Sequence, residues 1–410
     1  MKRFTVLIVL LVFVAMVAQA ADSPQFRGAN RDGKYGDTGL LKAWPEGGPP
    51  VAWVATGIGE GFSSASVVGD SVYITGMKEG QQGYLSVLNG TGKIQKQVVF
   101  GKESKNAQAP GPRATPTIDG NRLYLFSGVG VVCCFELPDL KPLWKVDTRD
   151  VFGGKKTMWE IAESILIDGD KAICTPGGPD ASIVALNKMT GDTIWTSKGL
   201  SDKASYCSAD IFTHNGRRLL ITETAKLVVA LEPDTGKVIW THPHKTNYDI
   251  HAVTPVYKDG TLYYTGGYKS GGGLLKLSED GSSVTQVWED ETLDCQHHGL
   301  VLKEGYIYGA GQSRHKGLLC MEMATGKIMW KTREVTQSAV VYADGMLYTY
   351  EGAKSGIVSL VKATPDGFER TGSFTVTEGE KQHWAHPTIA NGKLYIRHGD
   401  ALIAYDVSAK

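Results

Sequence analysis

The chain has 410 residues, with 43 Lys and Arg against 43 Asp and Glu, a formal net charge of +0 and a sequence pI of about 7.1. This balance excludes the strongly basic surface on which binders of nucleic acid and of anionic membranes depend. The 50 glycines exceed the usual share of about 7% and favour many short strands joined by tight turns.

Residues 1–20 have the pattern of an export signal. The basic pair Lys2-Arg3 precedes an apolar run, Phe4 to Val17, which ends at Ala18-Gln19-Ala20. A basic start, an apolar stretch and a small-residue cleavage site are typical of signal peptides, and the run is shorter than the roughly 20 residues of a membrane span. We therefore expect a signal peptide followed by one domain over 21–410, in a periplasmic or secreted protein. We expect no transmembrane segment after cleavage and no lipid anchor, because no cysteine follows the cleavage site.

A repeated frame runs along the rest of the chain. Residues 185–195 read Ala-x-x-x-x-Thr-Gly-x-x-x-Trp, the frame returns at 230–240 and 320–330, and a degenerate copy occupies 134–144. The tryptophans of the frame, with Trp288 counted among them, follow one another at intervals of 42 to 51 residues. These intervals are typical of four-stranded propeller blades.

Each unit opens with the pattern of a β-hairpin. Residues 117–124 and 257–264 each place an Asp-Gly pair between alternating apolar residues, which is the short-range signal for a hairpin. The Thr-Gly pair of the repeated frame supplies a second turn, because glycine accepts positive φ. Each unit is therefore predicted to form one antiparallel sheet of four strands.

Counting the unit starts gives eight: Ser64, Ala114, Glu163, Ala209, Val253, Gly299, Ala339 and Ala385. The eighth unit stops before its tryptophan, and Val51-Ala52-Trp53-Val54 can supply the missing outer strand, which would leave no open edge. The predicted fold is all-β: an eight-bladed β-propeller of four-stranded antiparallel blades, closed by an N-terminal strand that joins the C-terminal blade. We expect a monomer.

The repeated frame resembles the tryptophan-docking motif of quinoprotein alcohol dehydrogenases. The likeness covers nearly all of residues 40–410, and the segment 24–33 resembles the start of exported proteins in this superfamily. The chain is thus similar to PQQ-like propeller repeat proteins, including the BamB-like branch, whose members are scaffolds at the outer membrane. The resemblance implies that the frame tryptophans pack between neighbouring sheets as structural residues: Trp53, Trp144, Trp195, Trp240, Trp288 and Trp330.

The adjacent pair Cys133-Cys134 invites comparison with the vicinal disulfide that covers the quinone in that family. The repeat argues against this role, because Cys134 takes the position of Ala185 and Ala230 in a third strand. Cys133 would then point to the opposite face of the same strand. We interpret the pair as packing residues, and the pairing of the six cysteines stays open.

Polar residues precede the innermost strands, and these segments converge on the axis at one face of a propeller. A concave set of this kind can bind a small polar or carbohydrate-like ligand or a protein partner. The alternative is that these residues only satisfy loop backbone groups and water. A metal would need three or four ligands brought together, for instance His383 with His386 or His251, and none is assigned. The predicted ligand-binding funnel comprises Arg113, Trp159, Glu160, Asp210, His251, His298 with its neighbour His297, Gln337, His383, Trp384 and His386.

Two functional hypotheses follow. The first is a ligand-binding or protein-interaction scaffold that lacks the cofactor. The second, implied by the resemblance, is a small alcohol or sugar dehydrogenase using PQQ and Ca²⁺ as Lewis acid with a carboxylate base, for which Glu160 and Asp210 are the candidates. The chain lacks the long insertions of the dehydrogenases and a haem-binding Cys-x-x-Cys-His motif, which favours the scaffold.

Overall fold

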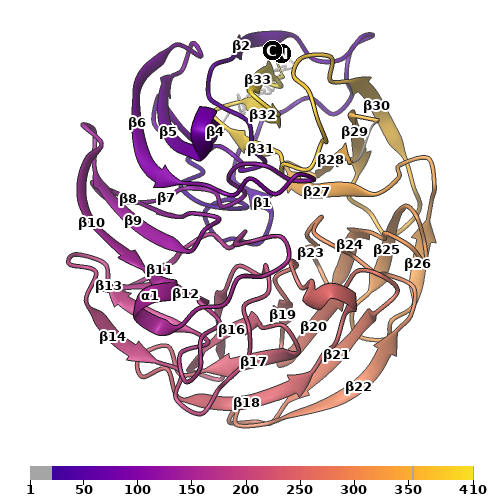
Figure 1. The fold of residues 1–410 in the computed structure, drawn as a ribbon. Helices are drawn as coiled ribbons and strands as arrows, with labels where there is room; N and C mark the ends of the chain where they lie inside the picture. Colours follow the sequence, from indigo (N-terminus) through magenta and orange to yellow (C-terminus); the bar gives the residue numbers. More distant parts are fainter. Residues whose placement is uncertain (1–20, 353–354, 410) are drawn as a thin grey trace, which may run out of the picture.

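The computed structural model describes residues 21–352 and 355–409, and the predicted signal peptide lies outside this range. Eight antiparallel sheets stand around a central axis (Figure 1). The prediction of an eight-bladed β-propeller is therefore confirmed. We number the sheets as blades 1 to 8 in chain order.

The first four blades each contain four consecutive strands, from the axis outward. Blade 1 is β3 (Ser66–Val68), β4 (Ser71–Lys78), β5 (Gln82–Asn89) and β6 (Ile94–Lys102). Blade 2 is β7 (Thr117–Asp119), β8 (Arg122–Phe126), β9 (Val131–Glu136) and β10 (Lys141–Asp147). Blade 3 is β11 (Leu166–Asp168), β12 (Lys171–Cys174), β13 (Val184–Asn187) and β14 (Thr193–Thr196). Blade 4 is β15 (Asp210–His214), β16 (Arg217–Glu223), β17 (Leu227–Leu231) and β18 (Val238–Pro243).

The other four blades complete the ring, and blades 7 and 8 recruit strands from the start of the chain. Blade 5 is β19 (Val256–Lys258), β20 (Thr261–Gly266), β21 (Gly271–Leu277) and β22 (Val284–Asp290). Blade 6 is β23 (Val301–Lys303), β24 (Tyr306–Ala310), β25 (Leu318–Glu322) and β26 (Ile328–Lys331). Blade 7 is β27 (Ser338–Ala343), β28 (Met346–Glu351), β29 (Ile357–Lys362) and β30 (Arg370–Thr375), with β1 (Lys34–Tyr35) added. Blade 8 is β31 (Thr388–Ala390), β32 (Lys393–His398) and β33 (Ala401–Asp406), with β2 (Val51–Ala55) added.

Helical structure is minor in the described ranges. It consists of α1 (Thr148–Phe152) and two 3₁₀ turns, η1 (Glu79–Gln81) and η2 (Asn247–Asp249). None of the helices in this part of the chain is long and apolar enough to cross a membrane.

The ring closes as predicted, through both ends of the described chain. Strand β2 pairs antiparallel with β33, with Val51 opposite Tyr405 and Trp53 opposite Ala404. The last blade thereby gains its outer strand from the N-terminal side, and the sheet edge that an open ring would expose is paired.

Tryptophans of the repeated frame join six of the eight blades to the blade that follows. The indole nitrogen of Trp195 in blade 3 donates to the carbonyl of Pro233 in blade 4, at 3.0 Å. Gly236, in the same turn, has φ of 70°, and a Cβ built there would lie 2.3 Å from the Trp195 ring. The turn therefore needs glycine both for its backbone conformation and for the close approach of the indole. A frame glycine lies against an indole ring in the same way at three other junctions: Trp53 with Gly92, Trp144 with Gly191, and Trp288 with Gly326.

The core lies between the blades, and the two adjacent cysteines serve different parts of it. Cys133 packs in the cluster between blades 1 and 2, whereas Cys134 packs in the cluster between blades 2 and 3. Neither residue is exposed, and all six cysteines of the described chain are free thiols. Alternation along β9 thus sends the pair to opposite faces of the sheet.

The main feature that the sequence did not reveal is a plug across the axis, formed by residues 23–35. It runs through the centre of the ring and ends in β1, which pairs parallel with β27 (Figure 1). Its backbone also bonds to Val67 in β3 and to Ile118 in β7.

Two buried arginines fix the plug to the inner ends of the blades. Arg31 donates to the carbonyls of Ala209 at 3.0 Å, Ile165 at 3.1 Å and Ser164 at 2.9 Å. Arg27 donates to backbone carbonyls on the opposite side of the ring, those of Val340 at 3.2 Å and of Leu300. The plug therefore spans the axis and is held on several sides at once.

Candidate functional site

An axial cavity of about 410 Å³ lies where the innermost strands begin. Phe26 of the plug forms part of its wall, so the plug closes the axis on that side. Five residues of the predicted funnel line it: Arg113, Trp159, Gln337, Trp384 and His386, together with His297. The structure thus brings these side chains to one cavity, and their role in binding a ligand stays a prediction.

Arg113 is the cationic side chain of the axial cavity. Its Nε and Nη2 atoms, which form one edge of the guanidinium, are buried and have no hydrogen-bond partner among the described residues. Burial lowers the pKa of Arg113, and the nearby Glu103 opposes that effect. Arg113 therefore places a positive charge in the wall of the cavity, and two adjacent N–H donors of its guanidinium are enclosed and unpaired.

Glu103 lies behind this wall rather than in it. Its carboxylate accepts hydrogen bonds from the backbone N–H groups of Ser104 at 2.8 Å and Gly128 at 2.7 Å. Burial raises the pKa of Glu103 to about 7, although these hydrogen bonds and Arg113 act in the opposite direction. At neutral pH the carboxylate balances only part of the charge of Arg113.

The two imidazoles of the cavity are neutral. Burial lowers the pKa of His297 to about 4, and burial together with the charge of Arg27 lowers the pKa of His386 to about 3. Arg27 Nη1 donates to Nδ1 of His386 at 3.0 Å. Nε2 of His386 donates to the carbonyl of His297 at 2.8 Å. His386 is thus held in one tautomer, while Nε2 of His297 has no partner among the described residues.

Amides and aromatic rings make up most of the remaining lining. Gln337 donates to Gln296 at 3.2 Å, and Gln296 donates to the hydroxyl of Tyr268 at 2.7 Å. The ring of Trp384 packs against Phe62, with centroids 5.3 Å apart. The indole nitrogen of Trp159 is buried and has no partner among the described residues. No Asp or Glu lines this cavity within the described ranges.

The predicted residue Glu160 does not line the axial cavity. Its carboxylate is ion-paired with Arg149 and, at 3.0 Å, with Lys156. Its backbone has φ of 66°, in the left-handed region. Glu160 is buried within a local ion-pair cluster beside the cavity.

Three predicted histidines are buried and do not line the cavity. His298 is buried with its ring centroid 4.0 Å from that of His297. His383 accepts or donates a hydrogen bond with the Tyr350 hydroxyl at 2.6 Å and stacks on His398, with centroids 3.8 Å apart. His251 contacts neither of them, and its partners are Glu223 and His244.

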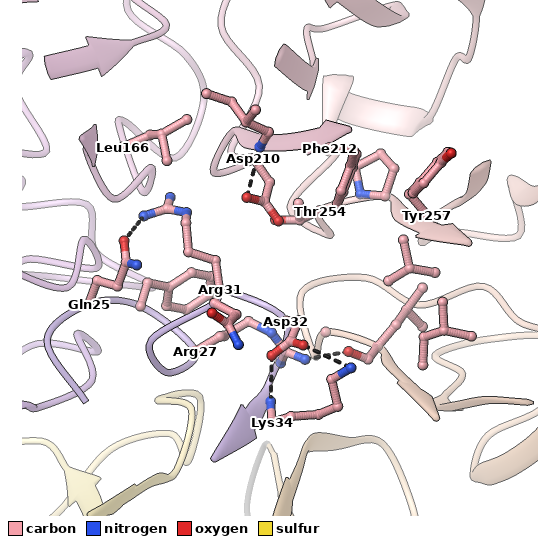
Figure 2. Close-up of a pocket in the computed structure, with 18 of the residues that line it drawn as sticks. Gln25, Arg27, Arg31, Asp32, Lys34, Leu166, Asp210, Phe212, Thr254 and Tyr257 are labelled. Atoms are coloured by element: carbon pink, nitrogen blue, oxygen red, sulfur yellow. Dashed lines mark hydrogen bonds and ion pairs between the residues drawn. The ribbon is translucent and has the colours of Figure 1, made fainter. Parts of the chain in front are cut away.

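Asp210 lies on the other side of the plug, in a second cavity of about 420 Å³. Figure 2 shows Asp210 facing this cavity with Arg31 and Lys34 of the plug. Burial raises the pKa of Asp210 to about 6, although the charge of Arg31 opposes it. The plug therefore separates Asp210 from the residues around Arg113.

Some cavity residues carried no signal in the sequence. Tyr268 comes from the β20–β21 connection and Gln312 from the β24–β25 connection, both outside the segments that precede the inner strands. Phe26 reaches the cavity only because the plug folds back across the axis. Ser64 and Ser208 do precede inner strands, so the rule that found Arg113 also covers them.

Comparison with known proteins places the chain in a family. The model PQQ_2, described as outer membrane protein assembly factor BamB, matches residues 81–332. The chain belongs to this family. The expected membership among PQQ-like propeller proteins is thereby confirmed.

Relatives of two kinds are found within this class. The chain is 29% identical over 175 residues to quinoprotein alcohol dehydrogenase PedH of Pseudomonas putida, covering 41% of this chain and 27% of PedH. It is 23% identical over 209 residues to outer membrane protein assembly factor BamB of Kangiella koreensis, covering 50% of this chain and 48% of that protein. The matches thus span about a quarter and about half of these two relatives.

Among solved structures, quinohemoprotein alcohol dehydrogenase from Comamonas testosteroni superposes with a TM-score of 0.64 at 12% identity. The match covers 95% of this chain and 81% of that protein. At this identity the likeness concerns the fold alone. The PQQ_2 chain is therefore related to both BamB and quinoprotein dehydrogenases, and the decision between their functions depends on the site.

The axial cavity does not offer the donors that Ca²⁺ with PQQ would require. Ca²⁺ takes six to eight oxygen ligands and prefers carboxylates, whereas the described lining contains amides, hydroxyls and rings but no carboxylate. Arg113 is the one cationic residue of the described lining. The residues present do not fit a PQQ–Ca²⁺ pair in this cavity.

Proposed function

We propose that this PQQ-like propeller is a non-catalytic binding scaffold whose axial cavity holds a small hydroxylated monocarboxylate, such as a sugar acid. The observation that carries the proposal is the guanidinium of Arg113, whose Nε and Nη2 are buried and unpaired, in the wall of a cavity whose described lining has no carboxylate. A change in the Arg113 side chain that opens Nε and Nη2 to the cavity would let these two donors pair with the two oxygens of one carboxylate.

The rest of the lining suits the hydroxylated part of such a ligand. The rings of Trp384 and Phe62 offer an apolar surface for the C–H face of a sugar, and the amides of Gln296 and Gln337 offer donors and acceptors for hydroxyl groups. A volume of about 410 Å³ lies within the range of small-molecule sites.

Energetics support a polar ligand over an empty cavity. A buried donor without a partner costs about 1–3 kcal/mol, and Arg113, Trp159 and His297 each contribute at least one buried nitrogen without a partner. A ligand toward which Arg113 and Trp159 turn their N–H groups would relieve part of this cost when it binds.

The test compares charged and neutral probes on the full mature chain. D-gluconate and D-glucuronate should raise the melting temperature and give a calorimetric binding signal, and D-glucose should bind more weakly. Because hydrogen bonds to a charged group are worth about 1.5–3 kcal/mol, Arg113→Gln should weaken binding of the acids by about 10-fold or more. Arg370→Gln is the matched control, because Arg370 lies on the outer strand β30, away from the axial cavity. Its guanidinium donates to the backbone carbonyl of Glu334.

Three outcomes would overturn the proposal. No binding of either acid by the wild type would remove the ligand class. Equal binding by wild type and Arg113→Gln, or equal binding of D-glucose and D-gluconate, would remove the role of Arg113.

The second candidate is a small quinoprotein dehydrogenase, favoured by the similarity to PedH. Addition of PQQ and Ca²⁺ to the purified protein, followed by absorbance, melting temperature and dye-linked alcohol oxidation, separates the two. A tight ligand stabilises the native state by RT ln(1 + [L]/Kd), and we expect no such shift. A shift with turnover would overturn the scaffold, and Glu160→Gln and Asp210→Asn would then test the predicted carboxylates.

We also infer that the protein acts after export, in the periplasm or outside the cell. Support comes from the signal-peptide pattern over 1–20 and from the printed role of the BamB relative in outer membrane protein assembly. A protein partner is part of this proposal, as BamB is an assembly factor. Mass spectrometry of the native protein should find a chain that begins at Ala21, and an intact Met1 would contradict it.

A further inference from the structure

Three side chains meet in a buried cluster beside the axial cavity. Glu223 ends β16, His244 follows β18, and His251 lies between η2 and β19. The exposed fractions of the three side chains are 0%, 6% and 0%. One ligating atom of each lies within 4.8 Å of the others.

The contacts among them centre on one carboxylate oxygen. Oε2 of Glu223 lies 2.6 Å from Nδ1 of His244 and 3.1 Å from Nδ1 of His251. The two imidazole rings have centroids 4.4 Å apart. Two ring nitrogens and a carboxylate therefore converge on one point.

The tautomer of His251 decides whether its Nδ1 can donate a hydrogen bond to Glu223. Its Nε2 lies 3.1 Å from the carbonyl oxygen of Ala225, which can only accept, so Nε2 carries a hydrogen. In the neutral ring, Nδ1 is then a lone pair that faces the Glu223 oxygen. Two acceptors in contact at a buried position need a proton or a metal ion between them.

The same hydrogen bond is the one that orients metal-binding histidines. Such histidines commonly donate their second ring nitrogen to a backbone carbonyl, which fixes the tautomer and aims the other nitrogen at the metal. Two further atoms of the cluster, Glu223 Oε1 and His244 Nε2, are buried without a partner among the described residues. The cluster thus has unused ligating capacity.

We propose that Glu223, His244 and His251 form a binding site for one divalent transition-metal ion, with Zn²⁺ as the best fit. Zinc takes imidazole nitrogen and carboxylate oxygen at about 2.0–2.2 Å, so neighbouring ligands of a tetrahedral ion lie about 3.3 Å apart. The 3.1 Å separation is close to this value. The 2.6 Å contact is a hydrogen bond, and binding would release its proton and let the pair open.

The donor set argues against hard cations. Ca²⁺ and Mg²⁺ prefer six or more oxygen ligands, and this cluster offers one carboxylate with two nitrogens. Imidazole and carboxylate together suit zinc and its first-row neighbours. A tetrahedral ion held by these three side chains would take one further ligand, such as water.

Such an ion would brace the wall of the axial cavity. His251 lies between Ile250 and Ala252, which both line that cavity, and its carbonyl accepts from the backbone N–H of Tyr206 at 2.9 Å. A metal bound to Glu223 ties this segment to β16 in blade 4. The inference concerns the scaffold itself and holds whatever ligand the axial cavity takes.

The test uses the full mature chain after treatment with EDTA. Calorimetric titration should show one Zn²⁺ per chain, and Co²⁺ should give visible absorption bands of a tetrahedral site. Loss of an outer-shell partner costs about 10–100-fold in affinity, so removal of a direct ligand in Glu223→Gln or His251→Ala should cost at least about 100-fold.

The control is His242→Ala, which removes an imidazole two positions from His244 that bonds to the Tyr264 hydroxyl instead. It should bind Zn²⁺ like the wild type. If the ligand variants fail to fold, crystals of the wild type soaked in Zn²⁺ and measured at the zinc absorption edge should show an anomalous peak between the three side chains. No binding by the wild type, equal binding by both ligand variants, or a peak elsewhere would overturn the proposal.

Discussion

Replacement of Arg31 by Met should show how strongly the plug is held in the axis. Arg31 has one of the few charged side chains buried in the centre of the ring, and its guanidinium donates to three backbone carbonyls of two blades, at 2.9 to 3.1 Å. Met keeps much of the volume of the side chain and removes every donor. The three carbonyls would then lose a partner inside the protein.

The expected magnitude follows from those three bonds. A buried polar group left unpaired costs about 1–3 kcal/mol, and water that enters the second cavity would satisfy part of the loss. We expect Arg31→Met to lower the free energy of unfolding by about 3–5 kcal/mol. Lys34→Met is the matched control in the same segment. Its ion pair with Asp32 is 2.9 Å long, but the lysine side chain is 39% exposed, and such pairs are worth about 0–1 kcal/mol.

Urea unfolding followed by tryptophan fluorescence measures both variants. Limited proteolysis reports whether the plug leaves the axis before the ring unfolds, because a detached segment is cleaved near its arginines. If Arg31→Met and Lys34→Met differ by less than about 1 kcal/mol and the plug stays protected, the account of the buried guanidinium is wrong.

Three further outcomes follow from the fold. Gly236→Ala should lower the melting temperature more than Gly216→Ala, because both have positive φ but only a Cβ at Gly236 would meet the Trp195 ring, at 2.3 Å; equal losses would show that the indole is not in contact. Burial raises the pKa of Glu163 to about 8, so the folded state holds this proton more tightly than the unfolded state does. The contribution of this proton to the free energy of unfolding is complete below about pH 4.5. It is lost as the pH rises towards about 8, which lowers the free energy of unfolding by up to about 5 kcal/mol. Glu163→Gln should flatten that slope in urea titrations, and an unchanged slope would refute the assignment. All six cysteines are buried free thiols, so a thiol reagent should modify none in the native protein and all six in denaturant; four in denaturant would instead indicate one disulfide.

The ring could be predicted because each repeat contains the residues that form its turn and its contact with the next blade. The Thr-Gly turn and the tryptophan of each unit depend on one another, as Gly236 and Trp195 show, so the pattern carries both the turn and the contact between blades. The closure was predictable for the same reason, since the eighth unit lacked a strand and Trp53 had no unit of its own.

The site was harder to predict, because side chains from separate connections build it. The rule that inner strands begin near the axis found Arg113 and Trp384, yet it also included His251 and His383, whose rings turn into the wall. Asp210 was assigned to the same funnel because the plug, which divides the axis, left no sign in the repeat. The opening segment resembles no blade, and nothing in its sequence indicates that its two arginines bond to carbonyls of several blades.

Indole N–H resonances in protein labelled with ¹⁵N-tryptophan test the central claim most directly. Trp159 and Trp240 both have an indole nitrogen that is buried without a partner, but only Trp159 lines the axial cavity. Saturating D-gluconate should shift the Trp159 resonance and leave that of Trp240 in place. If neither resonance moves, or if both move alike, the axial cavity is not where a hydroxylated carboxylate binds.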